Sequence, residues 1–255
     1  MASPTQVIVG FHAITARLRS QPESVAEIYL DATRDDARIR DLEAYAGARG
    51  ARVMKVATER LDGLAGGARH QGAVARVSVI APRWGSFEDR LDAVSGAPLV
   101  VLLDGVTDPH NLGAILRTCD AAGVHAVIAP KDRTVGLSST VMKVASGAAE
   151  TVPFFMVPNL ARVMGDLQER GLWIVGLAEE GGVELYDQQW PEAVAFALGA
   201  EGDGLRRLTR ERCDALVRIP MAGAIESLNV SVAAGVCLFE AVRRRGEIER
   251  QRQIA

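Results

Sequence analysis

Residues 219–242 read IPMAGAIESLNVSVAAGVCLFEAV, a loop that leads into a helix. Ser227 and Asn229 are both favoured N-cap residues, because a side-chain oxygen of either can accept a hydrogen bond from a free amide of the first helical turn. The helix is therefore expected to begin near Asn229. From there to Val242 almost every residue is apolar or small, which predicts a buried helix that another backbone can approach closely. Taken alone, these residues favour an ordinary capped core helix over an entry loop that belongs to a binding site.

Before this helix, short apolar runs alternate with helical segments. The expected strands cover residues 99–103, 124–129, 151–157, 173–178, 194–198 and 216–219. The expected helices cover residues 112–122, 138–146, 160–170, 208–213 and 230–245. Continuously apolar strands of this kind are typical of a parallel sheet, so the sequence predicts an α/β fold: a parallel sheet with helices on both faces. Such sheets bind ligands beyond the carboxyl ends of their strands, which directs attention to the loops that follow Leu103, Leu198 and Ile219.

The N-terminal part predicts a separate small α/β unit. Its expected strands cover residues 7–10, 28–30, 52–56 and 72–79, and its expected helices cover residues 13–19 and 36–48. Residues 61–72 are rich in glycine and predict an exposed, mobile loop, and neither His12 nor His70 is assigned to chemistry. Residues 81–97 mix helix breakers with charge, as linkers do. The expected division is a domain at 1–80, a linker at 81–97 and a domain at 98–255.

Composition narrows the class of protein. The 255 residues are 48% hydrophobic and 24% charged, as in ordinary soluble globular proteins. The first residues carry no targeting pattern, and no apolar run reaches the ~20 residues that span a bilayer, so a cytoplasmic protein without a membrane partner is expected. A net charge of −3 argues against a bulk polycation that coats nucleic acid, and no DNA partner is expected, but it leaves a local basic surface open. The basic clusters at 206–212 and 243–245 are interpreted as solvated helix ends.

The cysteines suggest neither a disulfide framework nor a metal site. Cys119, Cys213 and Cys237 are odd in number, far apart in the chain and set among apolar residues. They are expected to be buried thiols, and no metal ligand set is assigned.

The first of the three loops leads into the helix that carries Arg117. Asn111 can cap this helix, which would place its side chain at the mouth of the loop. Arg117 has Gly113, Ala114 and Ala121 one turn away, so its guanidinium has open space beside it and would form a pocket floor. The alternative is a surface arginine on an amphipathic helix.

The second loop, LGAEGDGL at residues 198–205, is a tight glycine-rich turn directly after a strand. Such a turn lets a ligand approach backbone amides, and Glu201 lies at its centre. The dinucleotide fingerprint needs a G-x-G-x-x-G pattern at the first strand-to-helix turn, which this chain lacks. A nicotinamide-dependent oxidoreductase is therefore the weaker alternative, and a thermal-shift comparison of cofactors would separate the two classes.

Three patterns occur together and in order. They are N-x-G-x-x-x-R at 111–117, L-G-x-E-G-x-G-L at 198–205, and I-P-M at 219–221 followed by E-S-L-N-V at 226–230. Together they resemble the three motifs of the SpoU-type, or SPOUT-class, RNA ribose 2′-O-methyltransferases, over roughly residues 98–245. The stretch GFHAITARL at 10–18 and HQG at 70–72 resemble the substrate-binding domain of the bacterial members that methylate a guanosine in 23S rRNA.

The resemblance implies a transferase that moves a methyl group from S-adenosylmethionine to the ribose 2′-hydroxyl of a guanosine in 23S rRNA or pre-ribosomal RNA. It further implies an L30e-like first domain, a C-terminal trefoil knot, and a homodimer whose active site is completed across two chains. Methylation of tRNA or another RNA by the same chemistry remains an alternative. A non-catalytic rRNA-binding protein is another, although it would have no need to keep Asn111, Arg117 and Glu201 together.

The resemblance also assigns roles to residues. The expected catalytic residues are Asn111, Arg117, Glu201, Ser227 and Asn229. The expected cofactor-binding residues are Gly199, Ile219 and Leu228. Family accounts let Arg117 take the hydroxyl proton, but a guanidinium, with a pKa above ~12, normally stays protonated. A clamp on the RNA phosphate is the alternative role for this arginine.

Overall fold

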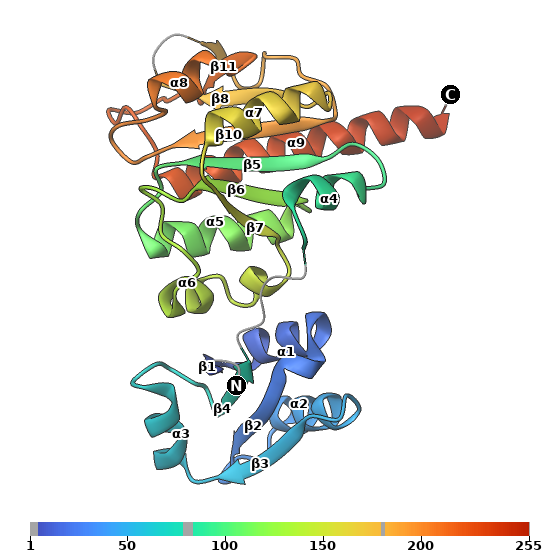
Figure 1. Cartoon of the computed structure of the whole chain (residues 1–255), viewed down its shortest axis with the longest axis vertical. Helices are drawn as coiled ribbons and strands as arrows, with labels where there is room; N and C mark the ends of the chain where they lie inside the picture. Colours follow the sequence, from blue (N-terminus) through green and yellow to red (C-terminus); the bar gives the residue numbers. More distant parts are fainter. Residues whose placement is uncertain (1–4, 79–83, 180–181, 255) are drawn as a thin grey trace. The chain divides into compact units, whose positions relative to one another are not determined.

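The computed structural model describes residues 5–78, 84–179 and 182–254 (Figure 1). The chain divides into two compact units. Unit 1 comprises Met1–Arg83 and Ser139–Thr151, and unit 2 comprises Trp84–Ser138 and Val152–Ala255. Residue 79 of the last strand expected in unit 1, and residues 81–83 of the expected linker, lie outside the described residues.

Unit 2 is built on a seven-stranded sheet. Its strands are β5 (Leu99–Asp104), β6 (Ala126–Pro130), β7 (Phe154–Val157), β8 (Trp173–Leu177), β9 (Val183–Glu184), β10 (Val194–Gly199) and β11 (Ala215–Arg218). Their order is β7-β6-β5-β10-β8-β11-β9, and each neighbouring pair is parallel. The predicted parallel sheet is confirmed. The two-residue β9 has no counterpart among the predicted strands, because it is too short to show a pattern.

Helices cover both faces of this sheet, as predicted. They are α4 (Phe87–Asp92), α5 (Pro109–Ala121), α7 (Leu160–Glu169), α8 (Arg207–Glu211) and α9 (Val230–Ile254). Val100 and Leu102 of β5 belong to the core cluster that includes the apolar side chains of α4 and α7. Val101 and Leu103 are equally buried but point to the other face, because alternate residues of a strand face opposite ways. On that side α9 packs against α5 and β10, and Figure 1 shows it passing behind the sheet.

Helix α4 corrects the expected linker. Ser86 caps it: the Ser86 side chain accepts a hydrogen bond from the amide of Asp89, whose carboxylate accepts one from the Ser86 amide. Phe87 and Leu91, four residues apart, are both buried in the core of unit 2. Residues 87–92 are therefore a short core helix, because a capping box and one apolar pair suffice where a sheet supplies the packing surface.

Helix α9 begins where expected but differs in its burial. Asn229 Oδ1 accepts a hydrogen bond of 2.9 Å from the amide of Ser231, so Asn229 is the capping residue. The helix runs to Ile254 and is buried on one side only: Val232 is 52% exposed and Phe239 is 50% exposed. The expectation of a wholly buried helix is wrong for the single chain, because the sheet and α5 cover only one face of it.

Unit 1 contains a four-stranded mixed sheet of order β1-β4-β2-β3. The strands are β1 (Thr5–Val9), β2 (Val25–Asp31), β3 (Arg52–Val56) and β4 (Ala73–Ser78). Between β1 and β4, the chain also forms the helices α1 (Phe11–Ser20), α2 (Ala37–Gly47) and α3 (Thr58–Ala65) and a 3₁₀ turn at Pro22–Ser24. Strand β4 pairs antiparallel with β1 and β2, and β2 pairs parallel with β3. The small α/β unit predicted for this part of the chain is present.

Helix α3 corrects the expected loop at residues 61–72. Leu61 is completely buried beside Tyr29 and Val74, and this packing stabilises a helix despite Gly63. Gly66 ends the helix in the left-handed conformation, with φ of 56°. Residues after Gly66 remain without regular structure until β4.

The segment Ser139–Thr151 also departs from the expected division, because it belongs to unit 1 rather than to the domain at 98–255. It holds α6 (Ser139–Val144) and the 3₁₀ turn η2 (Ala148–Glu150). Glu150 Oε1 accepts a hydrogen bond of 2.7 Å from Nη2 of Arg17, and both side chains are almost fully buried. A partner 133 residues away leaves no local pattern, so sequence reasoning could not find this pair.

Candidate active site

A cavity of about 690 Å³ lies where the carboxyl ends of β8, β10 and β11 meet the start of α9. Of the expected site residues, six line it: Gly199, Glu201, Ile219, Ser227, Leu228 and Asn229. Parallel strands bring their carboxyl ends to one edge of the sheet, which is why loops distant in sequence meet here. The loops expected after Leu198 and Ile219 therefore share one pocket.

The glycine-rich turn after β10 folds back on itself. Ala200 and Gly204 exchange two backbone hydrogen bonds of 3.0 Å each. A Cβ atom added to Gly199 would lie 2.0 Å from the carbonyl carbon of Gly204. Residue 199 must therefore be glycine, and the turn presents backbone to the pocket.

Three polar side chains form one hydrogen-bonded cluster: Asn111 from the first turn of α5, Glu201 from the turn after β10, and Asn229 from the start of α9. Asn111 lies inside α5 and does not cap it as expected, because Asp108 is the cap and accepts a hydrogen bond from the amide of His110. Glu201 accepts a hydrogen bond of 3.2 Å from Nδ2 of Asn111 and another of 3.2 Å from Nδ2 of Asn229. Asn229 Nδ2 also donates to Oδ1 of Asn111 at 3.0 Å. Asn111 is buried and Glu201 is exposed, so the cluster holds a carboxylate at the mouth of the pocket on a rigid base.

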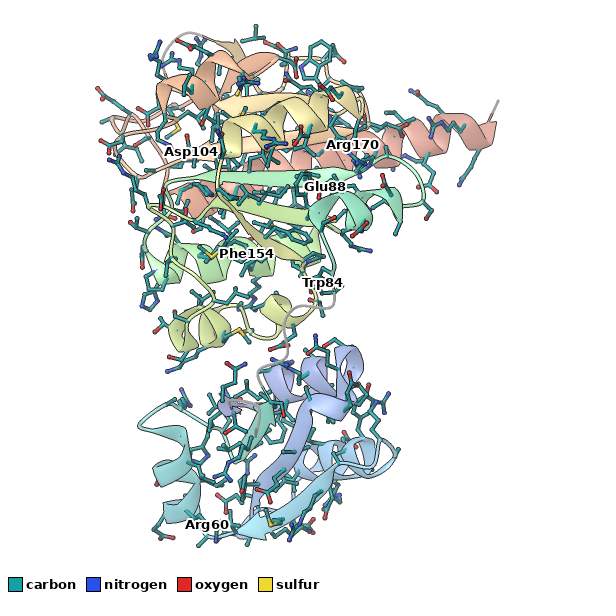
Figure 2. All side chains as sticks on the ribbon, in the orientation of Figure 1. Arg60, Trp84, Glu88, Asp104, Phe154 and Arg170 are labelled. Atoms are coloured by element: carbon teal, nitrogen blue, oxygen red, sulfur yellow. The ribbon has the colours of Figure 1, made fainter. Side chains whose placement is uncertain are left out.

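Asp104, which is labelled in Figure 2, is the last residue of β5. It holds the far end of the same turn. Its carboxylate is completely buried and accepts hydrogen bonds from the backbone amide of Arg206 at 3.0 Å and from Nε of Arg206 at 2.5 Å. Sequence reasoning missed this pair. The available signal was a single acid at the end of an otherwise apolar strand.

A second missed group follows β8. Glu179 and Glu184 line the cavity together with Arg218, whose Nη2 donates to Oε1 of Glu184 at 3.2 Å. Their signal was the acidic, glycine-containing stretch directly after a buried strand, at the same edge of the sheet as the other loops. Because Glu184 is paired with Arg218, the net negative charge that this group adds to the pocket wall comes from Glu179.

Arg117 does not lie where the sequence predicted. It is exposed on α5, outside the pocket lining, while Leu112, Ile115 and Leu116 turn inward. Across the described parts of the chain, its guanidinium makes no hydrogen bond or ion pair. The prediction that Arg117 forms the floor of the pocket is wrong for a single chain, because it occupies the solvent side of its helix.

The cysteines are buried, as expected, in two cases of three. Cys119 and Cys237 are fully buried and Cys213 is half-buried. Burial raises the pKa of all three thiols, that of Cys213 to about 12.

Within the residues described, no group of three His, Cys, Asp or Glu side chains is arranged to hold a metal ion. Nor does any helix in the described ranges have the length and apolar character needed to cross a membrane.

Fold and site together define an α/β protein with a ligand pocket beyond the carboxyl ends of a parallel sheet. Residues 98–239 match the SpoU rRNA Methylase family, and residues 7–80 match the family described as RNA 2′-O ribose methyltransferase substrate binding. The chain belongs to the SpoU rRNA methylase family, which confirms the resemblance seen in its motifs.

Curated relatives span nearly the whole chain. The 23S rRNA (guanosine-2′-O-)-methyltransferase RlmB of Ralstonia nicotianae is 55% identical over 246 residues, which cover 96% of this chain and 98% of that protein. The protein of the same name from Bordetella pertussis is 57% identical over 245 residues, which cover 96% and 99%.

Solved structures with the same fold include two that cover most of the chain. The SpoU methyltransferase AviRb from Streptomyces viridochromogenes, in complex with the cofactor AdoMet, superposes with a TM-score of 0.76 at 28% identity, covering 94% of this chain and 90% of that one. A protein described as an RNA 2′-O ribose methyltransferase gives a TM-score of 0.80 at 26% identity, covering 94% and 89%.

Proposed function

We propose that this protein transfers a methyl group from S-adenosylmethionine to the ribose 2′-hydroxyl of a guanosine in 23S rRNA, in the cytoplasm. The observation that carries the proposal is the Asn111–Glu201–Asn229 cluster at the mouth of a pocket bounded by a glycine-rich turn. The relatives named for that reaction, at 55% and 57% identity over almost the whole chain, support the choice of substrate.

The pocket fits the proposed cofactor in size and chemistry. Its volume of about 690 Å³ suits a ligand of nucleoside size, and Ile219 and Leu228 supply apolar walls beside the exposed backbone of Gly199. The nearby carboxylate of Glu179 complements a cationic ligand, whereas that of Glu184 is paired with Arg218. When bound, S-adenosylmethionine supplies an activated methyl group on a positively charged sulfur. We assign Gly199, Ile219 and Leu228 to its adenosine part.

The protein's own contribution is alignment of the ribose. Asn111 and Asn229 each donate to Glu201, so the carboxylate is held in place without an opposite charge to neutralise it. An oriented carboxylate can accept a hydrogen bond from a ribose hydroxyl and hold that oxygen in line for attack. Ser227, exposed on the pocket wall, is assigned a second contact to the RNA.

We further propose a homodimer in which Arg117 of the partner subunit completes each site. The exposed side of α9 carries Val232, Phe239 and Val242, an apolar strip that a second copy would cover. The adjacent helix α5 carries Arg117, exposed and without an ion-pair partner in the described parts of the chain. A dimer through these two helices would bury the strip and give the guanidinium an RNA phosphate to bind.

Two features rest on the resemblance and on family membership. They are an L30e-like fold for the first domain and a trefoil knot in the C-terminal part of unit 2. The proposed domain boundary near residues 81–97 rests on the helix breakers and charges in that stretch of sequence. The knot is open to a mechanical test. A single molecule is unfolded by pulling on its two termini, and the contour length of the stretched chain is measured. A contour length shorter than that of an unknotted chain of 255 residues would support the knot.

Mass spectrometry of nucleosides tests the proposed reaction. 23S rRNA from cells lacking the methyltransferase is incubated with the protein and S-adenosylmethionine, and the expected product is one 2′-O-methylguanosine per rRNA. Glu201→Gln, which keeps the shape of the side chain, serves as the inactive control. Methylation of tRNA alone would favour the alternative substrate, and tight rRNA binding without any methylation would favour a binding protein.

A further inference from the structure

The turn His70–Gln71–Gly72 in unit 1 is held in one conformation by several hydrogen bonds. The Gly72 amide donates to Nδ1 of His70 at 3.0 Å, so the proton of that ring lies on Nε2, which contacts Asp62 at 3.0 Å. The Gly72 carbonyl accepts from the amide of Asp31 at 3.0 Å. Since β4, which follows, lies between β1 and β2, the turn is anchored to a central strand of its sheet.

Arg34 closes over this turn. Its Nη1 donates to the carbonyl oxygen of Gln71, and its Nε donates to Asp36 at 2.8 Å. A Cβ atom on Gly72 would lie 2.6 Å from Nη1 of Arg34, and Gly72 has a φ of +93°. The positive φ favours glycine at residue 72, and the guanidinium is packed directly against the backbone of the turn.

Gln71 occupies this turn at an energetic cost. Its φ of 55° is left-handed, a conformation that glycine adopts freely and glutamine does not. Its side chain is exposed, and among residues 5–78, 84–179 and 182–254 its amide has no hydrogen-bond partner. The packing of unit 1 therefore does not explain why residue 71 is glutamine. A binding partner outside the protein that contacts the side-chain amide would explain it.

From these observations we infer that Gln71 reads the edge of one unpaired base of the substrate RNA. A primary amide places an acceptor beside a donor, and this pair matches a base edge, adenine in particular. The neighbouring Arg69 is exposed and lacks an ion-pair partner in the described residues, so it is available to a phosphate. The inference rests on the proposed function, since it takes RNA as the substrate and assigns a specificity contact to unit 1.

The choice of a base over a phosphate follows from charge. A phosphate contact favours a cation, and the Gln71 side chain carries no charge. The carboxylates of Asp62 and Asp36, which bond to the groups that hold the turn, are engaged by His70 and Arg34. A neutral side-chain amide on a rigid, strained turn interacts only weakly with the negative charge of the RNA phosphates, but its donor and acceptor can discriminate between bases.

The test uses the full-length protein and measures RNA affinity by fluorescence anisotropy. Overlapping transcripts of 23S rRNA are screened, and the tightest-binding transcript is scanned by single-base substitution. The variants are Gln71→Ala, Gln71→Glu and Gln71→Gly. Gln71→Gly relieves the backbone strain, so a lower affinity cannot be ascribed to misfolding of the turn.

Ser146→Gly is the matched control, because Ser146 is also exposed in unit 1 with a positive φ, of 52°. We expect all three Gln71 variants to bind roughly ten-fold more weakly, as for the loss of one bidentate base contact, with an unchanged salt dependence. The loss should vanish when one particular base of the transcript is substituted. Both glycine variants should melt at or above the wild-type temperature, and Ser146→Gly should bind normally.

Wild-type affinity in Gln71→Gly would overturn the inference. An equal loss on every substituted transcript, or a shallower salt dependence in Gln71→Ala, would also overturn it by indicating a non-specific or phosphate contact. Failure of the proposed function is separately visible, because it would leave the wild-type protein unable to methylate a transcript that it binds.

Discussion

Asp104 and Arg206 form an ion pair that is buried on one side only: the carboxylate is 0% exposed and the guanidinium 44% exposed. The pair joins the end of β5 to the end of the glycine-rich turn that carries Glu201. Because the Arg206 amide donates to the same carboxylate, the backbone as well as the side chain of Arg206 is held. Asp104 therefore acts as a positioning residue for one wall of the pocket.

This asymmetry predicts unequal effects of removing either partner. Arg206→Leu leaves a buried carboxylate with one backbone donor and should lower the free energy of unfolding by about 3–5 kcal/mol. Asp104→Asn leaves a guanidinium that can turn to water, so the loss of stability should be smaller, with weaker binding of S-adenosylmethionine as the main defect. Chemical denaturation and calorimetric titration measure the two quantities. The neighbouring pair Arg207–Glu211 is exposed, so Arg207→Ala is the control and should change neither. Equal destabilisation by both variants would contradict the assigned role.

Variants of Arg117 distinguish a phosphate clamp from a proton acceptor. As a clamp, Arg117→Lys keeps the charge but loses the two-pronged geometry, so activity should fall sharply at every pH. As a proton acceptor, lysine, with a pKa of ~10.4, would work as well or better at high pH. We expect the clamp result, and we expect Arg117→Ala to be nearly inactive with normal cofactor binding, because Arg117 lies outside the pocket. A lysine variant that reaches wild-type rates above about pH 9 would refute the clamp.

Phe239 should be central to the proposed dimer. It is 50% exposed in the single chain, so Phe239→Glu would place a charge in the contact and should yield a monomer by sedimentation at micromolar concentration. If Arg117 of the partner subunit completes each site, the monomer should still bind S-adenosylmethionine but lose methylation. Glu249→Lys, an exposed change further along the same helix, is the control. A wild-type protein that sediments as a monomer would rule out the dimer.

Unit 2 alone should keep the cofactor pocket but lose the substrate. A fragment of residues 84–255 retains all lining residues of the cavity, so it should bind S-adenosylmethionine and methylate rRNA poorly. In this fragment, the segment Ser139–Thr151 no longer packs against the rest of unit 1, and Glu150 has lost its partner Arg17. The fragment therefore carries the substitution Glu150→Gln, which removes the unpaired carboxylate. A fragment of residues 98–255 also lacks Phe87 and Leu91 and should be less stable by about 3–5 kcal/mol or more. Full rRNA activity in either fragment would show that unit 1 is dispensable.

The native thiols should react slowly. The thiolate is the reactive form, and burial raises the pKa of Cys119, Cys213 and Cys237, so very little thiolate exists near pH 7. A chromogenic disulfide reagent should titrate almost no thiol in the folded protein and three after denaturation. Cys213, which is only half-buried, should be the first to react as the pH rises. Rapid labelling of Cys237 in the native state would indicate that the core beneath α9 opens.

Local patterns were sufficient for much of this protein. The continuous apolar runs predicted the strands of the parallel sheet from β5 to β11 except β9, because burial on both faces removes polar residues from such strands. Asn229 was identified as a helix start because capping is a local hydrogen bond. The family could be recognised because its motifs are short stretches around Asn111, Glu201 and Asn229.

Only the tertiary structure decided which of these residues meet and which surfaces stay open. Asn111 and Asn229 are 118 residues apart, and their hydrogen bond depends on the order of the strands in the sheet, which no local pattern encodes. The same holds for Asp104 with Arg206, and for Glu150, whose long-range contact moves Ser139–Thr151 into unit 1. The same limit explains why Arg117 and Phe239 are exposed against expectation. Small neighbours around Arg117 and the apolar residues of α9 do not reveal what packs against each side of a helix, and in the single chain one side of α9 is uncovered.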